Sequence, residues 1–237
     1  MQVARRLGMS DFSEPLLLIN FKTYLESTGK LAVELSKKVE TVGENEGVSV
    51  AVAPQFCDIE QVAATVDIPV YAQHIDAVAP GAYTGHVLAE SVKAAGADGT
   101  LINHSERQLL LRDVDKSVEY ARSTGLMTVV CAGTSKLAAA VSLSEPDMVA
   151  IEPPELIGSG RAVSKENPEI VKDSVRRIRA VNSKVRILCG AGISTGDDVF
   201  AALKLGSQGV LVASGVVKAA KPEDVLADFC KAVRKFG

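Results

Sequence analysis

The sequence has no tryptophan, only 4% aromatic residues and no long apolar run. We expect no membrane-spanning segment, because no stretch is both long and apolar enough, and no signal peptide, because residues 1–15 lack a continuous apolar region. The net charge is −3, and no local cluster of lysine and arginine stands out. A nucleic-acid partner is therefore not expected either.

Cysteine is scarce and widely spread, with four residues at Cys57, Cys131, Cys189 and Cys230. They have no metal-ligand spacing, and a chain of 237 residues does not need disulfide bonds to stabilise its core. We expect reduced thiols, no metal site and a cytoplasmic protein.

What the sequence does contain is a regular series of short apolar, β-branched runs. Segments with helical spacing and charged outer faces lie between them. The eight predicted strands are Leu16–Asn20, Val48–Ala53, Pro69–Gln73, Gly99–Asn103, Met127–Ala132, Met148–Glu152, Val185–Cys189 and Gly209–Ala213. The predicted helices include Gly29–Val42, His86–Ala95, Lys116–Ser123, Asn167–Val181, Thr195–Leu205 and Pro222–Lys235.

This alternation predicts an α/β fold in which eight parallel strands close into a (β/α)8 TIM barrel ringed by helices. Residues 16–237 would form one barrel domain, and residues 1–15 an N-terminal extension. Glycines just after helical stretches, at Gly47, Gly96, Gly125 and Gly206, suit left-handed helix ends. The alternative is a doubly wound open sheet, but no G-x-G-x-x-G follows the first strand.

In such barrels the reacting groups lie at the carboxyl ends of the strands and in the loops that follow. At the end of the first strand, Asn20 and Lys22 are two residues apart, so in an extended chain they would share one side. An ammonium there suits a phosphate or a developing oxyanion, although most lysines are simply exposed.

The fourth strand is followed by His104, Ser105 and Glu106. Ser105 and Gln108 have capping-box spacing, which predicts a helix whose amino terminus lies at His104. The helix dipole would favour a neutral ring that donates or shuttles a proton, whereas the alternative is a histidine that only supports the turn. Of Glu106 and His104, Glu106 is the better candidate for a residue that acts only as a salt-bridge partner.

The sixth strand ends at Glu152, a candidate general base, because a carboxylate removed from water is a stronger base. The alternative is a solvated glutamate. The segment Pro154–Gly160 has a proline at its start and glycines at its end, as expected of a lid with hinges. Small residues also follow the last two strands, at Cys189-Gly190-Ala191-Gly192 and Ala213-Ser214-Gly215, where barrels often hold a phosphate.

Together these residues resemble the triosephosphate isomerase family from about Leu16 to the end of the chain. The resemblance rests on six pieces in the family's order: Asn20-Phe21-Lys22, Gly81-Ala82-Tyr83-Thr84-Gly85, His104-Ser105-Glu106-Arg107, Ile151-Glu152-Pro153 through Gly158-Ser159-Gly160, Cys189-Gly190-Ala191-Gly192, and Gly209 to Gly215.

The resemblance implies a cofactor-free isomerase that interconverts dihydroxyacetone phosphate and glyceraldehyde 3-phosphate through an enediolate. It implies Glu152 as base, His104 as electrophile, Lys22 and Asn20 as substrate-binding residues, and Glu106 as a residue that orders the site. The implied phosphate contacts are Ile157, Gly158, Gly190, Ala191, Gly192, Ala213 and Ser214. The loop His74–His86 resembles the family's interface loop, which implies a dimer or a tetramer.

Three departures from the bacterial and eukaryotic pattern resemble the archaeal branch. The lid has Pro154-Glu155-Leu156 without the usual tryptophan, and the fifth strand continues Cys131-Ala132-Gly133-Thr134 where the family usually has a glutamate. Ala213-Ser214 replaces the usual pair of glycines. These changes affect the details of the lid and leave the residues of the chemistry in place.

Two other functions are compatible with a phosphate-binding barrel. One is an aldolase that works through a lysine Schiff base, although such a lysine is expected on a middle or late strand. The other is a sensor that binds a phosphorylated ligand without turnover, since a fold does not fix a function. The joint presence of Glu152, His104 and Lys22 favours the isomerase.

Overall fold

The computed structural model describes residues 15–153, 156 and 162–237. Residues 1–14 of the predicted extension lie outside this range, as do all residues of the predicted lid except Leu156.

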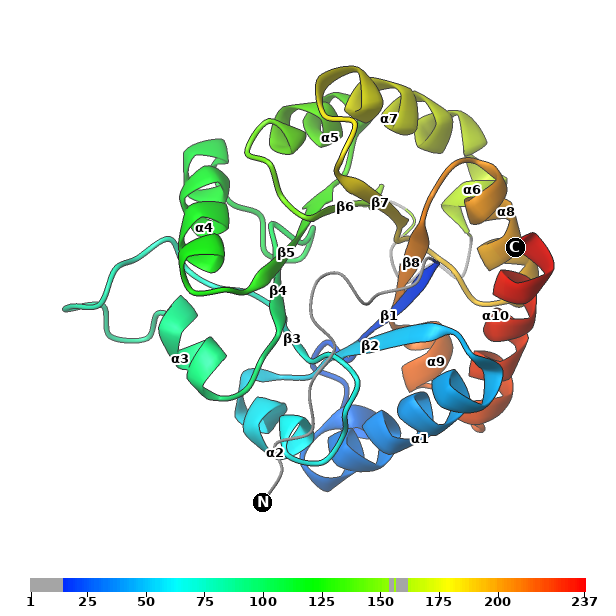
Figure 1. Cartoon of the computed structure of the whole chain (residues 1–237), viewed down its shortest axis with the longest axis horizontal. Helices are drawn as coiled ribbons and strands as arrows, with labels where there is room; N and C mark the ends of the chain where they lie inside the picture. Colours follow the sequence, from blue (N-terminus) through cyan, green and yellow to red (C-terminus); the bar gives the residue numbers. More distant parts are fainter. Residues whose placement is uncertain (1–14, 154–155, 157–161) are drawn as a thin grey trace.

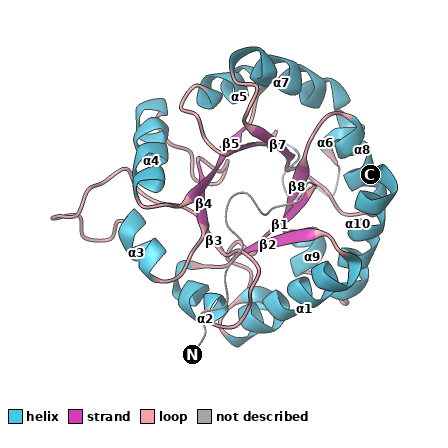
Figure 2. Cartoon of the chain, in the orientation of Figure 1, coloured by secondary structure: helices cyan, strands magenta, loops and turns pink. Residues whose placement is uncertain are grey.

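Eight parallel strands form a single ring at the centre of the molecule (Figures 1 and 2). The hydrogen-bonded order is β2-β1-β8-β7-β6-β5-β4-β3, and a parallel bridge between Val52 and Val70 joins its two ends. The predicted closed barrel is therefore confirmed. The strands are β1 (Leu16–Asn20), β2 (Ser49–Ala53), β3 (Tyr71–Ala72), β4 (Gly99–Ile102), β5 (Met127–Ala132), β6 (Met148–Ile151), β7 (Arg186–Cys189) and β8 (Gly209–Val212).

The helices form an outer ring around these strands (Figure 2). They are α1 (Lys30–Glu46), α2 (Ile59–Ala63), α3 (Ala89–Ala94), α4 (Leu111–Ser123), α5 (Ser135–Ser142), α6 (Val163–Glu166), α7 (Pro168–Val181), α8 (Gly196–Lys204), α9 (Ser214–Val217) and α10 (Pro222–Phe236), with 3-10 turns η1 (Leu25–Ser27) and η2 (Phe56–Asp58). The described ranges contain no helix with the length and apolarity needed to cross a membrane.

Strand alternation divides the core into two layers. Side chains such as Leu16, Leu18 and Met148 fill the inside of the barrel, whereas Leu17, Ile19 and Val149 pack outward against the helices. The same alternation carries Asn20 and Glu152 inward at the carboxyl ends of β1 and β6.

The turns that lead from helix to strand also follow the prediction. Gly47, Gly96, Gly125 and Gly206 all have positive φ, between 64° and 99°. A left-handed residue ends the helix at each of these points, and only glycine adopts this conformation without strain.

Two predicted features are wrong. The strand Pro69–Gln73 is reduced to Tyr71–Ala72, because its contact with β2 is a single bridge. No helix starts at Ser105. Residues 103–110 form turns instead, and α4 begins only at Leu111.

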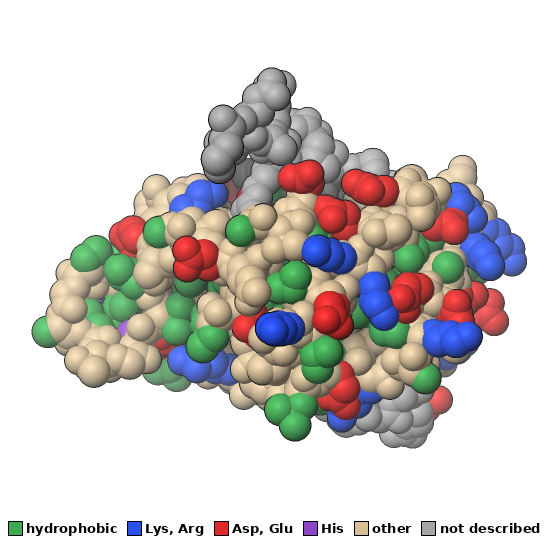
Figure 3. Space-filling view, turned by 90° about the horizontal axis from the view of Figure 1, so that it is seen from below, with side chains coloured by type: hydrophobic (Ala, Val, Ile, Leu, Met, Phe, Trp, Pro, Cys, Tyr) green, Lys and Arg blue, Asp and Glu red, His purple; other side chains and the backbone are tan. Residues whose placement is uncertain are grey.

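The surface carries both signs of charge. Figure 3 shows lysine and arginine interspersed with aspartate and glutamate over the face in view. The segment between β3 and α3, which contains the predicted interface loop, extends from one side of the ring (Figure 1).

Candidate active site

A cavity of about 290 Å³ opens at the carboxyl ends of the strands. It brings together polar residues from β1, β4 and β6 and small residues from the last two strands. Its lining is Asn20, Lys22, His104, Glu152, Gly190, Ala191, Gly192, Ile193, Ser194, Leu211, Val212, Ala213, Ser214 and Gly215.

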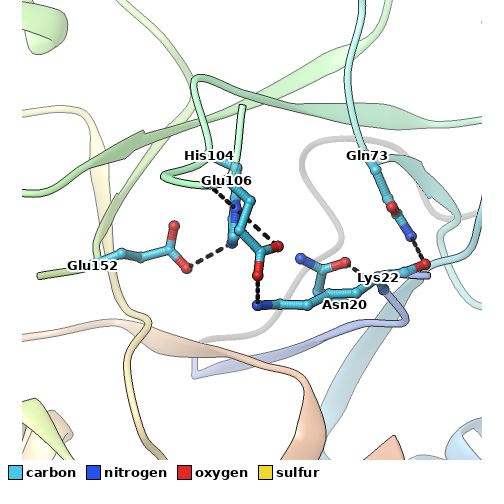
Figure 4. Close-up of polar contacts among 6 residues, drawn as sticks. All are labelled: Asn20, Lys22, Gln73, His104, Glu106 and Glu152. Carbon is cyan, nitrogen blue, oxygen red and sulfur yellow. Dashed lines mark hydrogen bonds and ion pairs between the residues drawn. The ribbon is translucent and has the colours of Figure 1, made fainter. Parts of the chain in front are cut away.

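Lys22 reaches this cavity through an unusual backbone conformation. Its φ is +48°, so Asn20 and Lys22 do not share one side of an extended chain, as the sequence had suggested. The Asn20 side chain accepts a hydrogen bond from the Lys22 N–H at 3.0 Å. Gln73 donates from Nε2 to the Lys22 carbonyl at 2.9 Å and to the Ala53 carbonyl at 3.0 Å (Figure 4). These hydrogen bonds stabilise a backbone conformation that a lysine rarely adopts.

Glu106 forms an ion pair with the ammonium of Lys22 and orients it. Lys22 Nζ lies 2.8 Å from Glu106 Oε1 (Figure 4), and the lysine side chain is 11% exposed against 57% for the glutamate. Glu106 itself is absent from the cavity lining. Its contact with Lys22 agrees with a role in ordering the site, rather than in touching a ligand.

His104 lies on the turn after β4, held by hydrogen bonds of its neighbours. Asn103 has φ +61°, donates from Nδ2 to the Cys131 carbonyl at 2.9 Å and accepts from the Leu109 N–H at 2.8 Å. The Glu106 N–H donates to His104 Nδ1 at 3.2 Å. An acceptor at Nδ1 leaves the proton of a neutral ring on Nε2. The contact that favours the expected neutral ring is therefore this amide, and not a helix dipole.

His104 Nε2 in turn faces the Glu152 carboxylate at 3.5 Å (Figure 4). Burial lowers the pKa of His104, but the hydrogen bond and the charge of Glu152 raise it, and the result lies above the ordinary value. The amide at Nδ1 opposes a second ring proton, because two donors would then face each other. The amide contact favours a neutral ring with its proton on Nε2.

Glu152 has a buried carboxylate, and the residue is only 3% exposed. Among the described residues, its Oε2 atom has no hydrogen-bond partner. A Cβ atom on Gly190 would lie 2.9 Å from Glu152 Cγ, so the glycine makes room for the carboxylate. Burial, and then the charge of Glu152, raises the pKa of the Cys131 thiol well above its ordinary value. This thiol is a neutral neighbour of the base.

The predicted phosphate contacts in the described residues line the cavity between β6 and β1, because β7 and β8 lie between those two strands in the ring. Gly190, Ala191 and Gly192 follow β7, and Ala213 and Ser214 follow β8. Ile157 and Gly158 lie outside the described residues.

Sequence reasoning missed two polar residues at the site. Gln73 is the polar residue at the end of the predicted third strand, and it bonds the Lys22 carbonyl, so inspecting every strand end would have found it. Ser194 lines the cavity two residues after Gly192, beyond the glycine motif. Within the described part of the chain, no cluster of three or more His, Cys, Asp or Glu side chains is arranged to hold a metal ion.

Fold and site together define a closed (β/α)8 barrel with a carboxylate and an imidazole side by side at its carboxyl-terminal rim. A sequence profile of triosephosphate isomerase matches residues 15–233. The chain belongs to the triosephosphate isomerase family, isomerases of the intramolecular oxidoreductase class that interconvert dihydroxyacetone phosphate and D-glyceraldehyde 3-phosphate in glycolysis.

Archaeal relatives match over nearly their whole length. The triosephosphate isomerase of Methanocaldococcus jannaschii is 50% identical over 216 residues, which are 91% of this chain and 99% of the relative. The enzyme of Methanosarcina acetivorans is 52% identical, covering 92% and 99%. That of Methanobacterium bryantii is 53% identical, covering 93% and 98%. The predicted resemblance to the archaeal branch is thereby confirmed.

Proposed function

We propose that this chain isomerises triose phosphates with Glu152 as the general base, His104 as the electrophile and Lys22 as the cationic group. The observation that carries this proposal is the pair formed by Glu152 Oε1 and His104 Nε2, 3.5 Å apart in a cavity that the Lys22 ammonium also lines. Isomerisation needs a base, a proton donor to oxygen and a stabilising positive charge, and these three side chains supply them.

The proton moves between two neighbouring carbon atoms of the substrate. Glu152 removes it from the carbon next to the carbonyl, and the bonding electrons move into the carbonyl to form an enediolate. His104 gives its Nε2 proton to the former carbonyl oxygen and takes up the proton of the neighbouring hydroxyl, while Lys22 stabilises the negative charge. Glu152 then returns the proton to the other carbon, so no external oxidant or reductant is consumed.

The phosphate end of the substrate is assigned to the part of the cavity formed by the residues that follow β7 and β8. Gly190, Ala191, Gly192, Ala213 and Ser214 leave the backbone accessible there, since their side chains are absent or small. Asn20 binds substrate beside Lys22, and Glu106 orders Lys22. Ile157 and Gly158 remain proposals from sequence, because they lie outside the described residues.

The proposal extends to assembly and location. Residues Gly81–His86 of the loop His74–His86 are exposed on a segment that extends from the barrel, which supports the use of this loop as a dimer or tetramer interface. Hydrogen bonds join the two ends of the loop: His74 Nε2 bonds Asp76 Oδ1 at 3.0 Å, and Asp76 Oδ2 accepts the Val87 N–H at 2.6 Å. We further propose a cytoplasmic protein with residues 16–237 as one domain and residues 1–15 as an extension.

A direct assay tests the function. The purified chain should convert each triose phosphate into the other in a coupled assay, and a chelator should leave the rate unchanged. Treatment with borohydride and dihydroxyacetone phosphate should leave Lys22 unmodified by mass spectrometry. Absent turnover would contradict the isomerase, and a reduced adduct on Lys22 would support the Schiff-base aldolase instead.

A further inference from the structure

A second buried carboxylate lies directly behind the phosphate end of the cavity. Asp198, in the first turn of α8, has a side chain only 6% exposed. Its Oδ2 atom accepts the Ser194 N–H at 3.1 Å and the Thr195 N–H at 3.0 Å. Ser194 itself lines the cavity. The carboxylate is thus separated from the ligand space by a single residue.

Asp198 fixes the shape of the turn that follows Gly192. The Thr195 side chain accepts the Asp198 N–H at 3.3 Å, which completes a capping box at the start of α8. On the other side of the turn, a Cβ on Gly215 would lie 2.8 Å from the Ile193 carbonyl oxygen. The segment from Ile193 to Thr195 is therefore held between α8 and the residues after β8.

The other carboxylate oxygen is engaged by a different element. Lys165 Nζ, on α6, lies 2.6 Å from Asp198 Oδ1. Two more hydrogen bonds join the same helix to residues on either side of the turn. The Ser164 hydroxyl donates to the Asp198 carbonyl at 3.1 Å, and the Val163 N–H donates to the Ala191 carbonyl at 3.1 Å.

This arrangement has an electrostatic consequence for an anionic ligand. Burial raises the pKa of Asp198, but the hydrogen bonds from Lys165, Ser194 and Thr195 lower it by more, so the group is ionised at neutral pH. An unpaired carboxylate here would repel a phosphate dianion in the neighbouring cavity. The ammonium of Lys165 offsets that charge at Oδ1, whereas the amides of the turn bind Oδ2.

We propose that Asp198 and Lys165 act together as positioning residues for the phosphate end of the substrate. Asp198 shapes the turn from Ile193 to Thr195, and Lys165 neutralises Asp198 so that the turn accepts a dianion. This inference rests on the proposed function, because it assumes that the phosphate of a triose phosphate lies beside this turn.

The test starts with Lys165→Met, which keeps the apolar stem and removes the charge. The matched control is Lys172→Met, because Lys172 is also half-exposed and ion-paired, 2.8 Å from Glu169 on α7. Lys165→Met should raise KM, and the Kd of 2-phosphoglycolate measured by calorimetry, by about three- to tenfold, since a charge near the ligand is left uncompensated. The turnover number should change by less than about twofold, because the reacting carbons are remote. Lys165→Arg should restore the parent values, and high salt should reduce the defect.

A second variant separates charge from shape. Asp198→Asn keeps an oxygen that accepts the Ser194 and Thr195 amides but removes the negative charge. The double variant Lys165→Met/Asp198→Asn should therefore bind 2-phosphoglycolate more tightly than Lys165→Met alone. Parent affinity in Lys165→Met, or no recovery in the double variant, would overturn the proposal.

The binding and turnover measurements test the two proposals separately. A parent chain that binds 2-phosphoglycolate, loses affinity with Lys165→Met and yet does not isomerise would contradict the proposed function alone. A parent chain that isomerises, with Lys165→Met at parent affinity, would contradict the role of this pair alone.

Discussion

At the scale of single residues, Gly190 and Glu152 depend on each other. The Gly190 N–H donates to the Ile151 carbonyl at 3.0 Å, which brings the glycine alongside Glu152. A Cβ at position 190 would lie 3.0 Å from Glu152 Oε1 and 3.2 Å from Leu211 Cβ. Because Leu211 fills the barrel core, the flexible carboxylate is the group that would move. We infer that Gly190 keeps the space in which the base is held.

Gly190→Ala should therefore lower kcat/KM by about tenfold or more, since displacing a reacting group by a fraction of an ångström is costly. Steady-state kinetics with both triose phosphates measures this loss. Thermal unfolding should accompany it, to establish that the variant is folded. Parent kinetics in a folded Gly190→Ala variant would contradict the spatial role.

This role of Gly190 could not be predicted from the sequence. The motif Cys189-Gly190-Ala191-Gly192 predicted a phosphate contact because it follows a late strand and is rich in small residues. The contact with Glu152 depends on the register of β6 and β7, in which Ile151 pairs with Cys189. Register between strands 38 residues apart has no local signal, as Ile151 and Cys189 are joined only in the folded sheet.

At the scale of elements, the turn between β4 and α4 determines how His104 is presented. The predicted capping box at Ser105 and Gln108 was a local signal, but the Asn103 side chain competes with it by binding the Leu109 N–H and the Cys131 carbonyl. Asn103 is also one of the residue types that most readily adopt positive φ. A long-range bond to β5 thus overrides a weak helix signal.

Asn103→Gly tests this turn without adding strain, because glycine accepts the left-handed backbone. The variant loses both side-chain hydrogen bonds, so the free energy of unfolding should fall by about 1–3 kcal/mol. Turnover should fall as well, since His104 is then less firmly held. Denaturant unfolding and kinetics check the two effects. Full stability and full activity would show that the backbone conformation alone is sufficient.

Helices with a repeated apolar pattern could be predicted from the sequence, whereas short helices could not. The long helices α1, α7, α8 and α10 have an apolar stripe repeated over several turns, and their predicted bounds differ from the observed ones by a few residues. The short helices α2, α6 and α9, of four or five residues, are too brief to establish a period. Their positions follow from packing around the barrel.

At the scale of the whole molecule, the closed ring leaves the loop between β3 and α3 as a clear extension (Figure 1). Residues Gly81–His86 of this loop are exposed, and Tyr83 is 48% exposed, with its ring packed edge-on against His86 at 5.6 Å. A second copy of the chain would cover these side chains. We expect sedimentation to give a mass at least twice the 24.9 kDa of one chain.

Thr84→Arg should weaken this assembly, because a charged side chain would have to be buried at the interface. Dissociation should appear at low protein concentration in analytical ultracentrifugation, together with lower turnover. Gln61→Arg, on the exposed side of α2, is the matched control and should leave both unchanged. A monomeric parent chain with full activity would contradict the proposed self-association.

The most direct test of the central claim is the turnover of Glu152→Gln, in which the base is removed and the side-chain size is kept. The control is Glu119→Gln, an exposed position on α4 remote from the cavity. We predict that Glu152→Gln lowers kcat by about a hundred- to ten-thousand-fold, the usual contribution of a general base, with a much smaller change in KM. Glu119→Gln should have the parent rate. Parent turnover in Glu152→Gln would contradict the account, because no proton could then be passing through Glu152.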